Sequence, residues 1–448
     1  PLSVLKAVRE AVPNMVIECR CSAQEDTPDG LQLEESLQFM ERAQEYVDII
    51  HISRGNIFFN YGSTYTIPTY FKGRQLNVAF AAEAKKRLHV PVAVVGNITS
   101  LQEAEEIIGA GKADIVVMAK AYMADENLIH KSIRGHAEDV RPCTRCDWCG
   151  NANNYGTSMR CAINPMLGKD INLGALVKPG EEKHVMVIGG GPGGMMAAQT
   201  LREMGHRVSL YEKSDRLGGL LNDATVASFK EYMRLYLQWD IRQTMACGAE
   251  IHLNTAVTPE LVEQVNPDAV IVATGSSYVH PPIPGIDLEK VKTVSDVENH
   301  RTPVGEQVVV CGGGIVGLEC AVMLGMEGKK VTVIDQIPLE KFADGMPVFN
   351  HIELNHQLEK YGVTLEGGQK ITSFDEGGVN TVDANGTCHC YPGDTYVLAL
   401  GVKPDNKLAQ TLLSKYAEGV YVVGDCVSTG RLLADANQEA FHAAIRIR

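Results

Sequence analysis

One short stretch of the sequence carries enough reactive side chains to hold a metal centre. It reads CTRCDWCGNANNYGTSMRC, residues 143–161, and has four of the twelve cysteines in the spacing C-x2-C-x2-C-x11-C. These are Cys143, Cys146, Cys149 and Cys161. Four thiolates spaced in this way bind either a tetrahedral zinc ion or an iron–sulfur cluster. The spacing leaves both open, although its long last gap differs from the cysteine run of two-cluster ferredoxins.

Two further segments share a glycine pattern. Each is G-x-G-x-x-G placed directly after an apolar run, HVMVI in one copy and QVVVC in the other, and directly before a helical pattern. The glycines are Gly189, Gly191 and Gly194 in the first copy and Gly312, Gly314 and Gly317 in the second. The next strand of each copy ends in an acid, Glu212 or Asp335, 23 residues beyond the first glycine. Both copies therefore contain every part of a dinucleotide-binding unit.

The chemistry of these units follows from their parts. The glycines let the backbone approach a pyrophosphate at the N-terminus of the helix, and the acid accepts hydrogen bonds from the adenosine ribose. Asp335 would repel a 2′-phosphate, and Gln336, Ile337 and Pro338 supply no cation to offset that charge. The second unit is therefore predicted to bind NADH rather than NADPH.

Hydrophobic periodicity predicts the elements that position these residues. Within residues 1–138, apolar strands at 15–22, 47–53, 90–97 and 113–120 alternate with amphipathic helices. Apolar strands that alternate with helices indicate a parallel sheet covered by helices. Four such units correspond to the C-terminal half of a (β/α)8 TIM barrel. The cysteines follow in an irregular segment, after which the α/β alternation returns.

Composition limits the classes of function. A chain of 448 residues forms about three domains. A net charge of −14 argues against nucleic acid and anionic membranes as partners, and no apolar run approaches the roughly 20 residues of a membrane span. The other cysteines are scattered, as is typical of thiols in a reducing cytoplasm. We expect a cytoplasmic protein that acts on a small molecule. The sequence leaves open whether the protein forms a homo-oligomer.

The two glycine units resemble the nested Rossmann-like domains of the FAD- and NAD(P)H-dependent disulfide reductase-like flavoproteins. AVIVATG (269–275) resembles their Ala-Thr-Gly strand end, GVYVVGDC (419–426) their closing FAD motif, and RLGGLL (216–221) the loop that covers the flavin. The resemblance implies FAD in the first unit and NADH in the second. The further contacts that it implies are Gly219, Thr274, Gly275, Gly424 and Asp425 for FAD and Gly401 for NADH.

The order of these parts predicts the domain organisation. We expect a partial TIM barrel at 1–138 and an iron–sulfur segment with linker at 139–180. The FAD-binding domain should occupy 181–295 and 416–448 and enclose an NADH-binding domain at 296–415. An iron–sulfur cluster is favoured over zinc in this setting, because a one-electron carrier has a use beside flavins and a zinc ion has none.

The whole chain resembles the multidomain Old Yellow Enzyme family, which includes 2,4-dienoyl-CoA reductase, enoate reductases, bile-acid-inducible NADH:flavin oxidoreductases and trimethylamine dehydrogenase. The resemblance rests on the barrel pattern, the cysteine motif followed by Ala-Ile-Asn-Pro (162–165), and the two glycine units, in that order. It implies a [4Fe-4S] cluster on the four cysteines and FMN in the barrel. The FMN contacts that it implies are Arg20, Gly96, Asn97, Ala119 and Lys120, the last two standing where the family usually has Gly-Arg.

The resemblance also implies an activity, the NADH-dependent reduction of an activated C=C bond of the enoate, enoyl-CoA or steroid enone class. Electrons would pass from NADH through FAD, the cluster and FMN to the substrate. The segment after the second strand lacks the histidine of dienoyl-CoA reductases, whose place falls near Ser63, so Tyr61 and Tyr65 are the candidate proton donors. Two alternatives stay open: an amine dehydrogenase that passes electrons to a partner carrier, and an electron-transfer module without the first half of the barrel.

Overall fold

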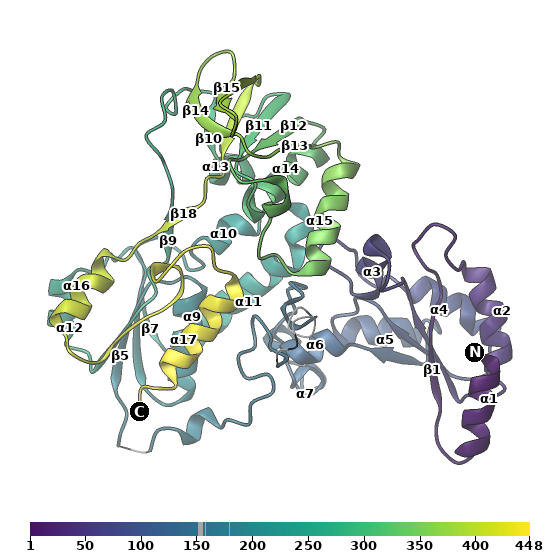
Figure 1. Ribbon diagram of the computed structural model, residues 1–448. Helices are drawn as coiled ribbons and strands as arrows, with labels where there is room; N and C mark the ends of the chain where they lie inside the picture. Colours follow the sequence, from purple (N-terminus) through teal and green to yellow (C-terminus); the bar gives the residue numbers. More distant parts are fainter. Residues whose placement is uncertain (151–155, 157, 179) are drawn as a thin grey trace. The chain divides into compact units, whose positions relative to one another are not determined.

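The computed structural model describes residues 1–150, 156, 158–178 and 180–448. These residues form two compact α/β units (Figure 1). The first comprises residues 1–147 and 347–353, and the second comprises residues 148–346 and 354–448. Among the described helices, none combines the length and the hydropathy that a membrane span needs.

The first unit is built on one sheet of four parallel strands whose spatial order follows the sequence. Neighbouring strands pair in register, so that Arg20, His51, Ala93 and Ile115 form one row across the sheet. Each strand is followed by a helix, which confirms the predicted half of a (β/α)8 barrel. The strands are β1 (Glu18–Ser22), β2 (Ile49–Ser53), β3 (Val92–Val95) and β4 (Ile115–Val117). The helices are α1 (Leu2–Ala11), α2 (Leu33–Ala43), α3 (Asn60–Thr66), α4 (Val78–Lys85), α5 (Leu101–Gly109), α6 (Ala119–Ala124) and α7 (Leu128–Ile133).

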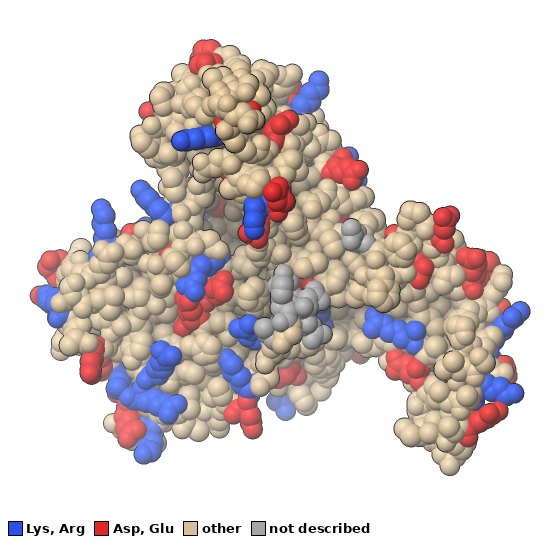
Figure 2. Space-filling model, in the orientation of Figure 1, with Lys and Arg blue, Asp and Glu red and all other residues tan. Residues whose placement is uncertain are grey.

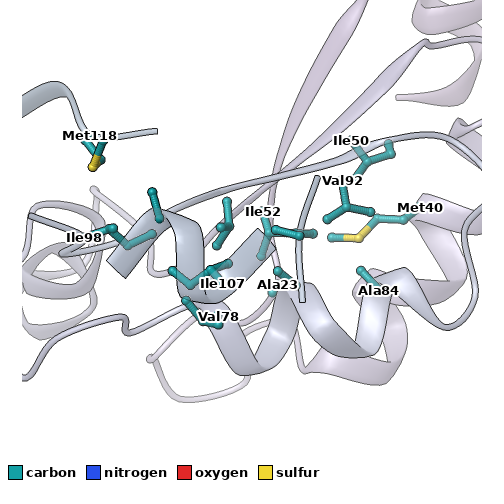
Figure 3. Packing of buried hydrophobic residues seen from close by; sticks show 14 of the residues in the cluster. Ala23, Met40, Ile50, Ile52, Val78, Ala84, Val92, Ile98, Ile107 and Met118 are labelled. Carbon is teal, nitrogen blue, oxygen red and sulfur yellow. The ribbon is translucent and has the colours of Figure 1, made fainter. Parts of the chain in front are cut away.

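The two faces of this sheet differ in polarity because successive side chains of a strand point to opposite sides. Ile50, Ile52 and Val92 are fully buried and pack with Met40 of α2 and Ile107 of α5 (Figure 3). Burial of each such side chain contributes about 1.5–3 kcal/mol of transfer free energy. The opposite face carries Arg20 of β1 and His51 of β2, so these two polar groups lie on the side of the sheet away from the apolar core.

The second unit contains two parallel sheets of the same design, with strand orders β19-β8-β5-β6-β7 and β10-β17-β11-β12-β13. The strand before each glycine turn, β5 or β11, is central, and its two successors lie to one side of it. Such a reversal of strand order is the switch point at which α/β sheets bind ligands. The first sheet has β5 (His184–Ile188), β6 (Arg207–Tyr211), β7 (Glu250–His252), β8 (Ala269–Val272) and β19 (Val420–Val422). The second has β10 (Val291–Thr293), β11 (Gln307–Cys311), β12 (Lys330–Ile334), β13 (Thr364–Glu366) and β17 (Thr395–Leu398).

The chain passes between these two sheets along β9 (Ser276–Tyr278) and β18 (Val402–Pro404), which pair with each other antiparallel (Figure 1). A three-stranded antiparallel sheet joins β14 (Lys370–Phe374), β15 (Val379–Val382) and β16 (Cys388–Tyr391). The helices that accompany these sheets are α9 (Pro192–Glu203), α10 (Leu221–Ala224), α11 (Glu231–Ala246), α12 (Pro259–Val265), α13 (Val294–Glu298), α14 (Ile315–Met326), α15 (Val348–Lys360), α16 (Lys407–Lys415) and α17 (Leu433–Ala444). The repeat seen in the sequence is therefore a repeat of structure, with one Rossmann-like domain inserted into the other.

Charged side chains of both signs are interspersed on the face drawn in Figure 2. On that face the described residues form no continuous basic field of the kind that binds a phosphate backbone.

Candidate functional sites

The first glycine turn is a closely packed bend between β5 and α9. Gly189 has a φ of 107°, and a β-carbon there would lie 2.3 Å from the carbonyl oxygen of Ala273. A β-carbon on Gly194 would lie 1.8 Å from the carbonyl oxygen of Gly189. Gly191 is the N-cap of α9. The bend therefore accepts only glycine at its first and last positions, and it exposes a helix N-terminus of the kind that binds pyrophosphate.

Glu212 fixes this turn from the end of β6. Its Oε2 accepts a hydrogen bond from the amide of Gly190 at 2.6 Å, and its Oε1 accepts from the amide and hydroxyl of Ser214, both at 2.8 Å. The residue is 7% exposed. A carboxylate has about four acceptor positions, so it can also receive the hydroxyl groups of a ribose. The predicted ribose acid thus lies directly against the predicted pyrophosphate turn.

The second glycine turn repeats this geometry between β11 and α14. Gly312 has a φ of 133°, and a β-carbon on Gly317 would lie 2.0 Å from its carbonyl oxygen. Gly314 is the N-cap of α14. Asp335 accepts a hydrogen bond on Oδ2 from the amide of Gly313 at 2.7 Å, the counterpart of the bond that Glu212 accepts in the first turn. The structure therefore fits a dinucleotide at both turns.

Two strand ends meet beside the first turn. The hydroxyl of Thr274 donates to the carbonyl oxygen of Asp405 at 2.6 Å, and the amide of Asp405 donates to the carbonyl oxygen of Gly275 at 2.9 Å. Ser276 donates its hydroxyl to Oδ2 of Asp425 at 3.0 Å. Burial raises the pKa of Asp425. These contacts bring the Ala-Thr-Gly strand end and the closing motif to one edge of the sheet.

Three more predicted glycines have backbone conformations that favour glycine. Gly219, Gly401 and Gly424 have φ values of 54°, 83° and 74°. A β-carbon on Gly219 would lie 3.1 Å from the α-carbon of Gly191, so the flavin-cover loop runs close to the first glycine turn. The amide of Gly424 donates to Glu439 at 2.9 Å. The backbone conformation at each of these positions therefore favours the glycine that the motif contains.

The two compact units divide the cysteine motif, with Cys143 and Cys146 in the first and Cys149 and Cys161 in the second. Cys161 is buried and the other three are partly buried. Residues 151–155 and 157 of the motif lie outside the described residues. Thiols are the soft donors that an iron–sulfur cluster requires, so the donor type that each unit supplies fits that group.

The backbone of the first half of the motif is tightly curled. Arg145 and Asp147, on either side of Cys146, have left-handed φ values of 56° and 59°. Such conformations cost on the order of 1–3 kcal/mol each and persist only when the surroundings hold them. Lys120 donates to Oδ1 of Asp147 at 2.7 Å, and Asn350 of α15 donates to the carbonyl oxygen of Cys146 at 2.8 Å. An ion pair and a side-chain amide therefore support the curl.

The second half of the motif is held by α17. Gln438 donates from Nε2 to the carbonyl oxygen of Cys161 at 3.1 Å. Asn437 donates from Nδ2 to the carbonyl oxygen of Ala162 at 3.0 Å and to the hydroxyl of Tyr236 at 3.2 Å. In both halves, the carbonyl oxygen of a cysteine thus accepts a hydrogen bond from the side-chain amide of a residue far away in the sequence.

The predicted phosphate turn of the barrel follows β3. Gly96 has a φ of 138°, and a β-carbon there would lie 2.5 Å from the side-chain nitrogen of Asn77. Asn97 has a φ of 59° and is 3% exposed, and its Nδ2 donates to the carbonyl oxygen of Gly73 at 2.5 Å. Gly96 and Asn97 thus form a close backbone turn at the carboxyl end of the strand, where barrels of this kind bind phosphate.

The other predicted FMN contacts have different surroundings. Arg20 is exposed on the polar face of the sheet, in register with His51, whose pKa is lowered by burial. Ala119 begins α6, and Lys120 is the residue that pairs with Asp147 of the cysteine segment. Arg20 therefore lies where a cation could meet a flavin ring, whereas the Lys120 ammonium is engaged by the cysteine segment.

The candidate proton donors are half-buried and belong to one polar cluster in the first unit. The hydroxyl groups of Tyr61 and Tyr65 lie 3.1 Å apart, and Lys72 donates to Tyr61 at 3.2 Å. The Lys72 ammonium lies 3.8 Å from the ring centroid of Tyr65 and pairs with Glu353 of α15 at 2.7 Å. Burial raises the pKa of Tyr61 well above its usual range. The phenol therefore stays protonated and can act as a donor.

Some of the residues that surround these groups carry no motif in the sequence. They are Lys72, Asn350, Glu353, Asn437 and Gln438. One signal was present in the sequence of α17, where Ala434, Asn437, Phe441 and Ala444 lie on one helix face and are all buried. A polar residue within an otherwise apolar helix face indicates a buried partner, but the pattern does not say which partner.

Comparisons with known proteins agree with this architecture. Residues 183–443 match the family model described as pyridine nucleotide-disulphide oxidoreductase, and residues 1–139 match that described as the NADH:flavin oxidoreductase / NADH oxidase family. An NADH oxidase of Thermoanaerobacter brockii is 32% identical over 456 residues, which cover 100% of this chain and 69% of that protein. A cinnamate reductase of Clostridium sporogenes is 31% identical over 375 residues, covering 83% of this chain and 54% of that protein. A solved complex of 2-naphthoyl-CoA reductase superposes with a TM-score of 0.89 at 26% identity, covering 100% of this chain and 68% of that one.

These matches make the protein an enzyme of the NADH:flavin oxidoreductase class. Within that class, the chain belongs to the multidomain Old Yellow Enzyme family that includes 2,4-dienoyl-CoA reductase and trimethylamine dehydrogenase. The cofactors that accompany its two family domains and its cysteine motif are FAD, NADH, FMN and a [4Fe-4S] cluster.

Proposed function

We propose that the protein reduces an activated C=C bond at the expense of NADH. The substrate class is an enoate, an enoyl-CoA or a steroid enone. The overall reaction takes a hydride equivalent from NADH and a proton from the enzyme or solvent, and adds two hydrogens across the double bond. When bound, the cofactors supply the electron transfer, which runs from NADH through FAD and the [4Fe-4S] cluster to FMN and the substrate.

The complete second glycine turn is the observation that supports NADH as the electron donor. The bond from Gly313 to Asp335 at 2.7 Å matches the bond from Gly190 to Glu212 at 2.6 Å. A protein that only exported electrons from its barrel would need no second dinucleotide site. Asp335 also favours NADH over NADPH, because its charge would repel a 2′-phosphate.

The proposal assigns the cofactors to the predicted residues. FAD is assigned to 181–295 and 416–448, NADH to 296–415, FMN to the barrel residues 1–138, and the cluster to the four cysteines within 139–180. The residues for FAD are Gly189, Gly191, Gly194, Glu212, Gly219, Thr274, Gly275, Gly424 and Asp425. Those for NADH are Gly312, Gly314, Gly317, Asp335 and Gly401. Those for FMN are Arg20, Gly96, Asn97, Ala119 and Lys120, and those for the cluster are Cys143, Cys146, Cys149 and Cys161.

A pocket in the first unit supports a planar, largely apolar substrate. It has a volume of about 400 Å³ and lies beyond the carboxyl ends of β1 and β2, the side of a barrel on which substrates bind. Phe58 and Phe59 on its rim are 91% and 51% exposed. The names of the cinnamate and 2-naphthoyl-CoA reductases denote aromatic acyl substrates, which suits such a rim. The pocket is lined by Asp26, Thr27, Pro28, Phe58, Phe59, Tyr61 and Gly62.

We assign proton donation to the α-carbon to the Tyr61–Tyr65 pair. Tyr61 lines the pocket, is kept protonated by burial, and exchanges a hydrogen bond with Tyr65 at 3.1 Å. The Tyr61→Phe and Tyr65→Phe variants should slow substrate reduction, with the rate of flavin reduction by NADH unchanged. Equal rates of substrate reduction in both variants and the wild type would exclude the pair as the donor.

An anaerobic titration tests the direction of electron flow. NADH should bleach the flavin absorbance, and cinnamate or an enoyl-CoA should then restore it with formation of the saturated product. Bleaching by dimethylamine or trimethylamine, with none by NADH, would establish the amine dehydrogenase alternative instead. Extraction of FAD without FMN would identify the chain as an electron-transfer module.

A further inference from the structure

In each half of the cysteine motif, backbone carbonyl oxygens accept hydrogen bonds from neutral side-chain amides. Asn350 donates to the carbonyl oxygen of Cys146 at 2.8 Å and to that of Arg145 at 3.4 Å. Gln438 donates to the carbonyl oxygen of Cys161 at 3.1 Å, and Asn437 donates to the carbonyl that follows it. The donors come from α15 and α17, which lie 204 and at least 275 residues from their acceptors. Two helices that have no sequence proximity to the motif therefore make the same kind of contact with it.

These amides are not explained by packing alone. Asn350 is 1% exposed and Asn437 is not exposed at all. Among the described residues, Oδ1 of each has no hydrogen-bond partner. A buried acceptor without a partner costs free energy, and a leucine of similar size would avoid that cost. The fold thus tolerates an unsatisfied oxygen at both positions while using the amide nitrogen to hold a carbonyl of the motif.

The carbonyl of Cys146 needs such support because the backbone on either side of it is strained. Arg145 and Asp147 hold left-handed φ values around Cys146, and such a conformation relaxes when nothing fixes it. A neutral donor fixes the peptide without adding charge beside the thiolates. That distinction matters because net charge, hydrogen bonding and exposure to solvent set the reduction potential of an iron–sulfur cluster.

We propose that Asn350, Asn437 and Gln438 are positioning residues of the iron–sulfur site, which fix the peptide carbonyls of the ligand cysteines and thereby set cluster retention and reduction potential. This inference rests on the proposed assignment of the cluster to the four cysteines. The amides touch the ligand backbone and not the reacting atoms.

The test compares the full-length holoenzyme with variants that keep side-chain volume and remove the donor, Asn350→Leu and Gln438→Met. Outer-shell partners of metal ligands typically contribute about 10- to 100-fold to metal affinity. Both variants should therefore lose iron to a chelator about 10- to 100-fold faster, with a shifted midpoint potential and a changed electron paramagnetic resonance spectrum of the reduced cluster. Asn350→Asp should move the potential further in the negative direction, because it adds a negative charge beside the motif.

Asn299→Leu is the matched control, because Asn299 also donates to a backbone carbonyl, that of Ser295 at 2.8 Å, but its hydrogen bonds go to Ser295 and Asp223 rather than to the described residues of the cysteine motif. It should leave the iron content, spectrum and potential as in the wild type. Because Asn350→Leu removes a buried polar contact, the half-buried Gln438→Met decides the question if the first variant does not retain FAD.

The outcomes separate this inference from the proposed function. A wild-type protein without iron and acid-labile sulfide would remove the cluster assignment itself. A wild-type protein with the cluster, and variants with the same chelation rate, spectrum and potential, would overturn only the positioning role.

Discussion

Replacing Asp335 with alanine should weaken NADH binding and remove the discrimination against NADPH. Asp335 lies just after β12, where Oδ2 accepts from the amide of Gly313 at 2.7 Å and Oδ1 accepts from the amide of Ile337 at 3.2 Å. These two bonds aim the carboxylate at the glycine turn and leave acceptor positions for a ribose. The acid is therefore the residue at which the two nicotinamide dinucleotides differ most in their interaction with the protein.

The magnitude follows from hydrogen bonding and charge. A hydrogen bond to a charged group contributes about 1.5–3 kcal/mol, which is about 10- to 150-fold in the Kd for NADH. Two like unit charges about 4 Å apart repel by about 4 kcal/mol at an effective dielectric constant of about 20. Loss of the carboxylate should thus raise the Kd for NADH about 10- to 150-fold and lower that for NADPH by at least about 10-fold.

Anaerobic stopped-flow reduction of the flavin, measured against the concentration of each dinucleotide, gives both Kd values. Asp335→Asn keeps the shape and removes the charge, so it should show the gain for NADPH with a smaller loss for NADH. Glu212→Ala, in the equivalent position of the first turn, should instead lower the FAD content. If Asp335→Ala retains FAD and has the NADH preference of the wild type, the assignment of the second turn to NADH is refuted.

Three further predictions concern the first glycine turn, the Lys72–Glu353 ion pair and the buried Glu298 of α13. Gly194→Ala should abolish FAD binding, because its β-carbon would lie 1.8 Å from a backbone oxygen, whereas Gly193→Ala has 3.6 Å of room and should retain FAD in the same extraction assay. Lys72→Met removes the cation of the Lys72–Glu353 ion pair, whose side chains are 7% and 0% exposed. Urea unfolding should show a loss of about 3–5 kcal/mol in the free energy of unfolding, because the Glu353 charge stays buried without its partner. Adding Glu353→Leu should recover part of that loss. Burial raises the pKa of Glu298 from 4.5 to about 8. Between these two pH values the native state keeps a proton that the unfolded chain loses. The free energy of unfolding therefore falls by at most about 1.4 kcal/mol per pH unit as the pH rises from 4.5 to 8. Glu298→Gln should therefore raise the Tm at pH 8 and leave it nearly unchanged at pH 4.5; an equal effect at both pH values would contradict the raised pKa.

The parts of the sites that could be predicted are those in which sequence neighbours form the structure. The strand, glycine turn, helix and acid of each dinucleotide unit lie within 29 residues, 184–212 and 307–335. Their hydrogen bonds join residues 22 apart, as from Gly190 to Glu212. The four strands of the half barrel were also predicted, because apolar runs between helices have few other ways to be buried. Their ends shortened by a few residues in the structure, as for β4, which spans only Ile115–Val117.

The ion-pair partner of Lys120 is an example of a contact that local sequence patterns do not predict. The family resemblance implies an FMN contact for this residue. In the structure its ammonium pairs with Asp147, which is 27 residues away and 1% exposed at its side chain. A lysine side chain is long and flexible, so its partner is set by whichever charge the fold brings within reach, and no periodicity encodes that choice.

The sequence by itself determined the type of each binding unit, since ligand-binding turns and thiol spacings are written in residues that are close along the chain. Only the tertiary structure decided which side chains support those units. The Lys72–Glu353 pair and the amides of Asn350 and Gln438 join residues more than 200 positions apart. Such contacts depend on which helix faces pack together, and an isolated Asn or Glu in a helix has the same sequence signature whether it meets water, a lysine or the carbonyl of a cysteine.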